Sequence, residues 1–273
     1  MEIKLLSGAL GAEIEGIDLK DSSIENCNKI NNLLLEHKVL FFRNQNISPE
    51  QHIDLAKFFG PLEKHVYVKG LDKHPEIIRI IKGANEKHQW GETWHTDVSY
   101  NVKPTKVIIL RSIKIPPVGG ATFFVDANAA YEGLPQEIKQ KIDSLHAVHD
   151  FLRAFGRQTP KDKHDEIREK YPLVEHPVVI NHHQTGKPLL YVNRIFVTAI
   201  EGLNEKEGYE LIDLLCREFE ILEYSCRFRW EPDSIAFWDN QAVQHYAASD
   251  YSPHVRVMER ASIKGTRPKR TQR

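Results

Sequence analysis

The sequence predicts an α+β protein that is mainly β, with two packed sheets and a few flanking helices. Short runs of β-branched and aromatic residues recur from residue 76 onward, and few segments between them have helical spacing. Many short strands with helices outside them favour a double-sheet fold. The length of 273 residues is common for one such domain, so we expect a single domain over residues 1–273.

Four segments have the features of helices. Residues 24–37 carry apolar side chains at helical spacing and follow the capping candidates Ser22 and Ser23. A second helix begins at Ser48-Pro49, with proline at its first turn, and ends at about Phe59 before a Gly-Pro pair. Further helical patterns span residues 135–145 and 205–219.

The expected strands are the apolar or β-branched runs between these segments. They cover residues 39–42, 76–81, 106–111, 121–125, 176–180, 189–192, 234–238 and 255–263. Residues 153–170 are charged and weakly periodic, so we expect a long loop there. A loop of that length is more often functional than idle.

Composition favours a cytoplasmic protein that binds neither nucleic acid nor membrane. The chain has 37 basic against 38 acidic residues, and the basic tail 264–273 is interpreted as a solvated terminus. It has no secretory signal and no apolar run near the roughly 18 residues of a membrane span. Three cysteines without CxxC spacing indicate neither a disulfide framework nor a zinc cluster.

The strongest local signal is the triplet His95-Thr96-Asp97. In a strand, residues i and i+2 share a face, so an imidazole and a carboxylate would point at one place as two metal ligands. An HxD triplet alone is common, and a chance surface pair is the alternative. A metal site therefore needs a third ligand.

His245 is the candidate for that ligand. It follows the expected strand 234–238 and precedes one in which Arg256, Met258 and Arg260 share a face. Two imidazoles and a carboxylate on one face of an octahedron are the arrangement of non-haem Fe(II) oxygenases. The two guanidinium groups suit carboxylates or sulfonates, although pairing with surface acids is the alternative.

The sequence resembles the taurine dioxygenase (TauD/TfdA-like) family of Fe(II)/2-oxoglutarate-dependent dioxygenases nearly from end to end. The motifs that carry the resemblance are Gly11-Ala12-Glu13-Ile14, Gly16-Ile17-Asp18-Leu19, the segment 37–43, Phe58-Phe59-Gly60-Pro61-Leu62, Trp94-His95-Thr96-Asp97-Val98, Gly119-Gly120-Ala121-Thr122, Trp238-Asp239-Asn240, Gln244-His245-Tyr246-Ala247 and the arginine strand. It implies a jelly-roll core, the double-stranded β-helix.

The resemblance also implies a set of site residues and cosubstrates. His95, Asp97 and His245 match the family's Fe(II) ligands, and Arg256 and Thr122 match the residues that hold the far carboxylate of 2-oxoglutarate. O₂ is then the second cosubstrate. The residues that match the substrate pocket are Arg260, His65, Tyr67, Val98, Phe155 and Phe196.

The implied substrate is a small organic anion, foremost an alkyl sulfonate such as taurine, which would give sulfite and an aldehyde. A carboxylate, an alkyl sulfate or an aryloxyalkanoate stays open, because an arginine fork does not distinguish these anions. Gly91 stands where taurine enzymes have a pocket asparagine, and Arg194 is a charge that they lack. A homo-oligomer, dimer or tetramer, is also implied.

Two other functional classes compete. A zinc hydrolase could use the same three ligands but leaves Arg256 and Thr122 unexplained, and an inactive ligand-binding jelly-roll would be expected to have a broken triad. His182-His183, beside an expected hairpin turn at Gly186, is interpreted as a surface pair rather than a second metal site. Trp230 and Trp238 are expected in the core, with Trp238 as a candidate wall of the iron pocket.

Overall fold

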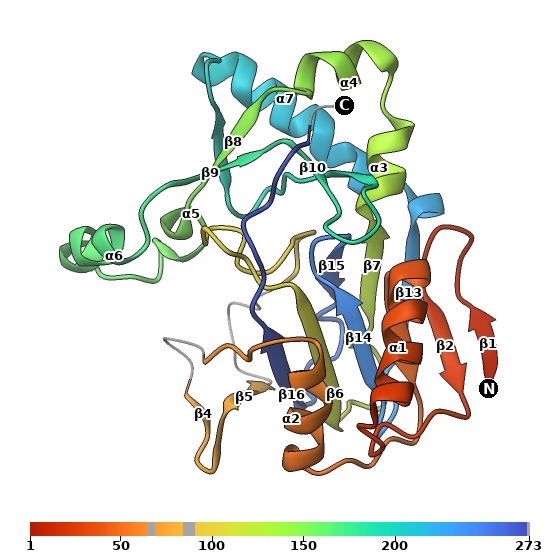
Figure 1. The fold of residues 1–273 in the computed structure, drawn as a ribbon. Coiled ribbons are helices and arrows are strands. Elements are labelled where there is room, and N and C mark those ends of the chain that lie inside the picture. Colours follow the sequence, from red (N-terminus) through yellow and green to blue (C-terminus); the bar gives the residue numbers. More distant parts are fainter. Residues whose placement is uncertain (65–68, 84–90, 272–273) are drawn as a thin grey trace.

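A computed structural model describes residues 1–64, 69–83 and 91–271 (Figure 1). The largest sheet has eight strands in the order β1 (Glu2–Leu5), β2 (Ala12–Glu15), β3 (Val39–Phe42), β14 (Ile235–Asp239), β6 (Val107–Lys114), β16 (Arg256–Ile263), β5 (His74–Lys82) and β4 (Gly70–Leu71). A second sheet has the order β13 (Ser225–Phe228), β7 (Thr122–Asp126) and β15 (Val243–Ala247).

Smaller sheets and helices complete the described part of the chain. The small sheets are β10 (Val179–Asn181) with β11 (Pro188–Leu190), and β12 (Val197–Ile200) with β8 (His146–His149) and β9 (Val174–Pro177). The α-helices are α1 (Ile24–His37), α2 (Pro49–Phe58), α3 (Ala127–Gly133), α4 (Gln136–Ile142), α5 (Phe151–Phe155), α6 (His164–Lys170) and α7 (Glu205–Arg217), and the 3₁₀ turns are η1 (Lys161–Lys163), η2 (Glu218–Glu220) and η3 (Leu222–Tyr224).

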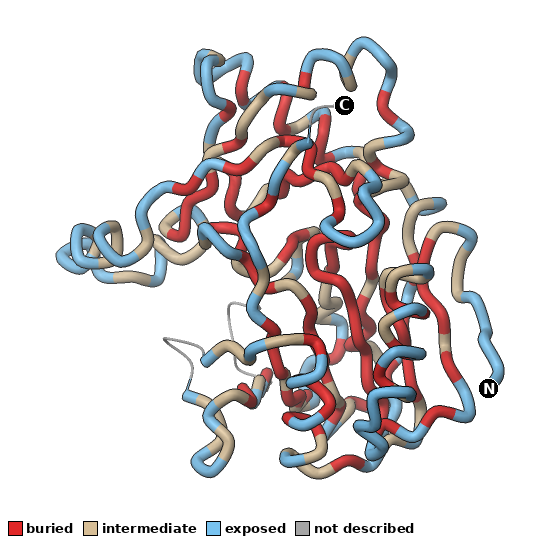
Figure 2. Tube along the Cα trace, in the orientation of Figure 1, coloured by how far each residue is buried: buried red, intermediate tan, exposed pale blue. Residues whose placement is uncertain are grey.

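The central strands β3 and β14 of the large sheet are buried on both faces, because alternate residues of each strand pack into two separate cores. On β14, Ile235 and Phe237 pack with α1 and α2, whereas Ala236 and Trp238 face the second sheet. Phe41 and Phe124 meet edge to face between the two sheets, with ring centroids 5.6 Å apart. Figure 2 shows this burial along the central strands. The structure confirms the expected jelly-roll class, with sheets packed over an apolar interior.

The two helices on the outer face begin where the sequence predicts. At α1, the Ser23 side chain accepts a hydrogen bond from the backbone of Asn26. At α2, Ser48 and Gln51 form a reciprocal capping box, with Pro49 at the first helical position. Both helices bury their apolar faces on the large sheet. They therefore cover the face of that sheet that points away from the second sheet.

Two predicted segments differ from the structure. The strand expected at 176–180 is divided at Val178, because Pro177 has no N–H to continue the ladder and Val178 donates instead to Leu145. Residues 153–170 are not one loop: they include the end of α5, η1 and α6. No residue of α6 is buried, so it has no apolar stripe to reveal it in the sequence.

The upper layer in Figure 1 packs α3, α4 and α7 around the small sheets. Its core includes Val179, Leu190 and Val197 from the strands and Leu215 from α7. Among the described residues, no helix combines the length and apolarity needed to cross a membrane.

Buried histidines should make stability depend on pH. Burial lowers the pKa of His52 and of His176 to about 4, from an ordinary value of 6.5. Below pH 6.5 the unfolded chain therefore binds protons that the native chain does not. The contribution to stability is complete above that pH and is lost as the pH falls toward 4. We expect the free energy of unfolding to decrease by about 2 kcal/mol for each of these histidines as the pH falls from about 7 to about 5. Urea denaturation at a series of pH values measures this change.

His52→Leu tests this dependence. The variant should have a flatter stability curve over the same range, because the titrating ring is gone. Replacement of the exposed His254 by leucine is the control and should leave the slope unchanged. Equal slopes for wild type and His52→Leu would contradict the assignment.

Candidate functional site

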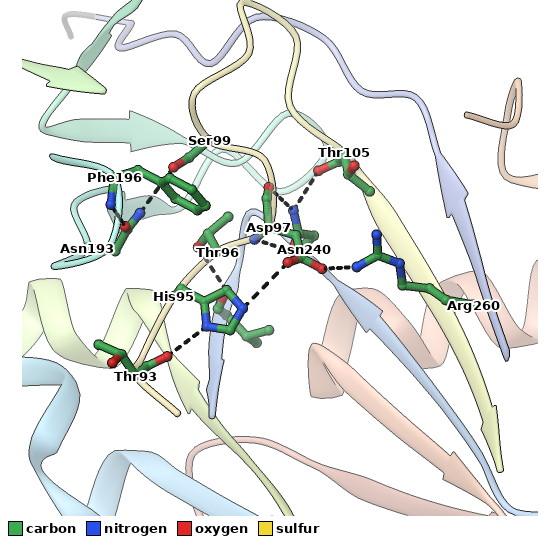
Figure 3. A network of polar contacts seen from close by, with 11 residues as sticks. Thr93, His95, Thr96, Asp97, Ser99, Thr105, Asn193, Phe196, Asn240 and Arg260 are labelled. Atoms are coloured by element: carbon green, nitrogen blue, oxygen red, sulfur yellow. Dashed lines mark hydrogen bonds and ion pairs between the residues drawn. The ribbon is translucent and has the colours of Figure 1, made fainter. Parts of the chain in front are cut away.

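The three predicted metal ligands come together between the two sheets. Figure 3 shows two of them, His95 and Asp97. His95, Asp97 and His245 each offer one ligand atom, and these atoms lie within 4.8 Å of one another. The Nε2 atom of His95 is 3.5 Å from Oδ1 of Asp97. Two imidazoles and one carboxylate on one side of an ion are a donor set that fits Fe(II), with positions left for other ligands.

Backbone pairing, rather than a continuous strand, aligns the two histidines. The N–H of His95 donates to the carbonyl of His245 at 3.2 Å, and the N–H of His245 donates back at 2.9 Å. The HxD segment was expected to be a strand, but His95 forms only an isolated bridge and Asp97 begins a turn. The turn places the Asp97 carboxylate close to His95. The ligands therefore come together through a turn and not, as expected, through the alternation of a strand.

Hydrogen bonding and burial set the two rings for metal binding. The Nδ1 atom of His95 lies 2.7 Å from the Thr93 carbonyl, so Nδ1 carries the proton and Nε2 presents its lone pair to the site. Burial lowers the pKa of His245 to about 3, and the neighbouring His95 adds to this effect. The His245 ring is therefore suited to bind a cation in its neutral form, and the His95 ring presents Nε2 to the same place. Trp238 packs 5.1 Å from the His245 ring, as a wall of the site.

Asp97 is the anionic member of the site. Burial alone would raise its pKa, but the Arg260 guanidinium and the nearby imidazoles outweigh burial and hold that pKa well below its usual range. Arg260 donates from Nη1 to Oδ2 of Asp97 at 2.8 Å. Its Nε has no hydrogen-bond partner among the residues that the structure describes. Arg260 thus has an N–H group at the edge of the metal site that can donate a hydrogen bond to a ligand.

Arg256 forms a second cationic site beside the triad. It is buried, and its Nη2 lies 3.4 Å from the Thr122 hydroxyl, which also accepts a hydrogen bond from Trp230. Burial lowers the pKa of Arg256 to about 10, so it is still charged at neutral pH. Its Nε has no hydrogen-bond partner in the described ranges. A buried guanidinium with a free donor fits a carboxylate ligand.

An aromatic cluster lies next to the Asp97 turn. Tyr100 from the turn packs edge to face against Phe151 and Phe196, with ring centroids 5.0 Å away in each case. Val98 and Phe155 pack against the same cluster. Three of the predicted substrate residues, Val98, Phe155 and Phe196, are therefore brought together. His65 and Tyr67, also predicted there, lie outside the described residues.

Other sequence-based interpretations fare differently. Arg194 pairs with Asp213 and Glu220, so its charge is already matched away from the triad. His182 was expected at the surface but is buried, and its Nε2 lies 2.8 Å from Asp239. Trp230 and Trp238 are both buried, as predicted.

Gly91, the position of the missing asparagine, lies beside the metal ligands. A Cβ built on Gly91 would stand 3.6 Å from Cε1 of His95, and the backbone has a φ of +96° that favours glycine. The described site therefore has no amide side chain at this position.

Three residues near the triad were missed by sequence reasoning. Asn240 hydrogen-bonds the backbone of Asp97, Glu63 accepts from Thr105 beside Arg260, and Tyr100 links the turn to the aromatic cluster. Burial raises the pKa of Glu63, against the hydrogen bond from Thr105 and the charge of Arg260. Asn240 had a signal, since it follows a buried strand within the motif quoted above. Glu63 and Tyr100 had none.

Comparisons with known proteins agree with this geometry. The family model "Taurine catabolism dioxygenase TauD, TfdA family" matches residues 2–262. An alkylsulfatase of Acinetobacter baylyi is 34% identical over 97% of this chain and 85% of its own length. An alpha-ketoglutarate-dependent sulfate ester dioxygenase of Pseudomonas putida is 31% identical over 98% and 91%.

A solved structure extends the likeness to three dimensions. A taurine dioxygenase from Burkholderia xenovorans superposes with a TM-score of 0.84 at 33% identity, covering 98% of this chain and 90% of that one. The relative from Pseudomonas putida is a dioxygenase that depends on alpha-ketoglutarate, and the donor set described above fits the Fe(II) of such enzymes. The chain belongs to the TauD/TfdA family of Fe(II)/2-oxoglutarate-dependent dioxygenases.

Proposed function

We propose that this dioxygenase hydroxylates an alkyl sulfonate or an alkyl sulfate ester at the carbon that carries the sulfonate or sulfate group. The observation that carries the proposal is the position of Arg260, whose guanidinium is 2.8 Å from the Asp97 carboxylate. An anion bound to Arg260 would lie beside the metal. Relatives described as acting on sulfate esters and sulfonates support this choice of anion.

The protein's own residues divide into two groups around the cosubstrates. His95, Asp97 and His245 would hold Fe(II), and Arg256 with Thr122 would hold the far carboxylate of 2-oxoglutarate. Bound Fe(II), 2-oxoglutarate and O₂ supply the oxidation, which leaves succinate and CO₂. Trp238 and the surrounding apolar core exclude water from the ligands.

Substrate placement falls to Arg260 and the aromatic cluster. Arg260 fixes the anionic end, and Val98, Phe155 and Phe196 receive the carbon chain. His65 and Tyr67 complete the proposed pocket through the family resemblance alone. Hydroxylation next to the anion would give an unstable product that separates into an aldehyde and sulfite from a sulfonate, or sulfate from a sulfate ester.

Gly91 favours substrates without an amino group over taurine within this class. An amine needs a polar partner when it leaves water, and glycine offers no side chain where an amide would lie near His95. The aromatic cluster, by contrast, makes the binding free energy of a substrate more favourable with each apolar carbon that it buries.

A substrate panel tests the proposal. The anaerobically iron-loaded protein would be mixed with 2-oxoglutarate and alkyl sulfates, alkyl sulfonates of increasing chain length, taurine, carboxylates or aryloxyacetates, and O₂ then admitted. We expect one sulfur-containing anion to stimulate succinate release, with sulfate or sulfite in equal amount. Stimulation by carboxylates or aryloxyacetates alone would contradict the substrate class. Failure to bind 2-oxoglutarate would contradict the cosubstrate site.

Arg260→Ala tests the anchor itself. We expect substrate-stimulated succinate release to fall at least about 30-fold, because the substrate anion would lose its charged partner, and such a loss costs about 2–5 kcal/mol where the pair is shielded from water. Binding of 2-oxoglutarate should stay within about threefold of wild type, since Arg256 is untouched. Arg227→Ala, which removes an exposed arginine above Phe123, is the control and should leave both unchanged. Full coupled activity in Arg260→Ala would refute the placement role.

A further inference from the structure

The side chain of Asn240 clamps the peptide groups of Asp97 across 143 positions of sequence. Its Oδ1 accepts a hydrogen bond from the backbone N–H of Asp97 at 3.1 Å. Its Nδ2 donates to the backbone carbonyls of Asp97 and Thr105, both at 3.0 Å (Figure 3). Asn240 has no exposed surface, so water does not compete for these bonds. One amide therefore fixes both ends of the residue that carries the carboxylate ligand.

The turn that Asn240 grips is strained. Val98 follows Asp97 with a φ of +50°, a conformation that β-branched residues rarely adopt. Such a residue costs about 1–3 kcal/mol and persists only where its surroundings hold it. On the far side of Val98, the Ser99 hydroxyl lies 3.0 Å from Nδ1 of His149 and accepts from Asn193 at 3.1 Å. The strained residue is thus held from both sides, by Asn240 before it and by the Ser99 contacts after it.

A buried hydrogen bond between His182 and Asp239 holds Asn240 in its turn. Asp239 receives His182 Nε2 at 2.8 Å on one oxygen and the backbone N–H groups of Gln241 and Ala242 on the other. The second ring nitrogen of His182 accepts from the backbone of Thr185 at 3.0 Å. Both nitrogens of His182 are engaged, so this group is a hydrogen-bonded support and not a second metal site.

The same short segment leads directly to the third ligand. Five positions separate Asn240 from His245, which is paired by backbone hydrogen bonds with His95. Asn240 thereby fixes the position of Asp97 relative to the segment that carries His245. The backbone hydrogen bonds between His95 and His245 fix the position of His95 relative to the same segment. Without Asn240, Asp97 would lose the hydrogen bonds on both of its peptide groups and would keep its side-chain contacts with Arg260 and His95 on a strained turn.

We propose that Asn240 is a positioning residue for the metal site, which presets the Asp97 carboxylate for binding before any ion arrives. This rests on the proposed roles of His95, Asp97 and His245 as ligands. Residues that orient metal ligands by hydrogen bonds typically contribute about 10- to 100-fold to metal affinity. A clamp on the ligand's peptide groups acts in the same way, because it removes the freedom that binding would otherwise have to restrict.

The test is Co(II) binding to the metal-free, full-length protein, measured by titration calorimetry and by the ligand-field spectrum of the bound ion. We expect Asn240→Ala to weaken Co(II) binding by about 10- to 100-fold and to alter the spectrum, which reports ligand geometry. Asn128→Ala is the matched control, because Asn128 donates an amide hydrogen bond to the Pro188 carbonyl away from the triad. It should leave Co(II) affinity within twofold of wild type.

The isosteric variant Asn240→Asp covers the case in which the alanine variant does not fold. It keeps the acceptor for the Asp97 N–H but loses both donated bonds, so Co(II) binding should again weaken at least about 10-fold. Co(II) affinity and spectrum equal to wild type in a folded Asn240 variant would overturn the positioning role. If wild type itself bound no Co(II), or Asp97→Asn bound it as tightly as wild type, the proposed ligand set would fail instead.

Discussion

Arg256→Ala is expected to raise the KM for 2-oxoglutarate by about 30-fold or more while leaving the free energy of unfolding unchanged or higher. Arg256 is buried and charged, and its Nε has no hydrogen-bond partner in the part of the chain that the structure describes. Such a group costs stability until an anion pairs with it. Removing the partner of a buried carboxylate costs about 2–5 kcal/mol, which corresponds to this change in KM.

The control for this effect is Arg111, on the neighbouring strand β6, where it pairs in register with Glu259 of β16. Arg111 lies near the buried Glu259, with 3.4 Å between Nε and Oε2, on the opposite face of the sheet. Arg111→Ala should destabilise the fold and leave the KM for 2-oxoglutarate within about threefold. Steady-state kinetics and urea denaturation of both variants provide the measurement. A large loss of stability in Arg256→Ala with an unchanged KM would assign Arg256 a structural role.

Asp97→Asn is expected to abolish tight metal binding and to lower coupled turnover by at least about 1,000-fold, or about 4 kcal/mol of transition-state stabilisation. The amide has the shape of the carboxylate, so the backbone bonds to Asn240 are retained and the fold survives. What is lost is the negative charge between the two imidazoles and Arg260. Metal content after dialysis and succinate release measure the two effects.

Asp126→Asn is the matched control for loss of a buried carboxylate. Asp126 pairs with Lys38 at 2.7 Å and caps α3, away from the triad, so its variant should lose stability but keep its metal. Normal metal content in Asp97→Asn would remove Asp97 from the ligand set. The Arg256 and Asp97 variants together also exclude a zinc hydrolase, whose activity would depend on Asp97 but not on Arg256.

The sequence predicted the parts of the site that strand periodicity controls. Arg256, Met258 and Arg260 share the inner face of β16, because alternate residues of a strand must. The helices α1 and α2 begin at their capping serines for an equally local reason. Strands such as 234–238 were recognisable because both faces of the large sheet are buried.

The parts that were missed depend on contacts between distant residues. Nothing near Asp97 indicates that Asn240 will grip it, and no propensity predicts a positive φ at a valine such as Val98. His182 has the neighbours of a surface turn, yet Asp239 draws it into the interior. The sequence did not predict α6 because none of its residues is buried and it therefore has no apolar stripe. A contact with a distant residue stabilises it: Arg168 of α6 forms an ion pair with Asp150.

The strand order also constrains when a newly synthesised chain can acquire its iron. In the large sheet, β16 is synthesised after all its neighbours and lies between β6 and β5, and β14 lies between β3 and β6, so the middle of this sheet is made after its edges. His245 is likewise the last of the three ligands to be synthesised, and it supplies the backbone partner of His95. A chain that has not reached β14, β15 and β16 therefore has neither the complete sheet nor the third ligand. Oxygen-activating chemistry becomes possible only after these strands have been made and have packed.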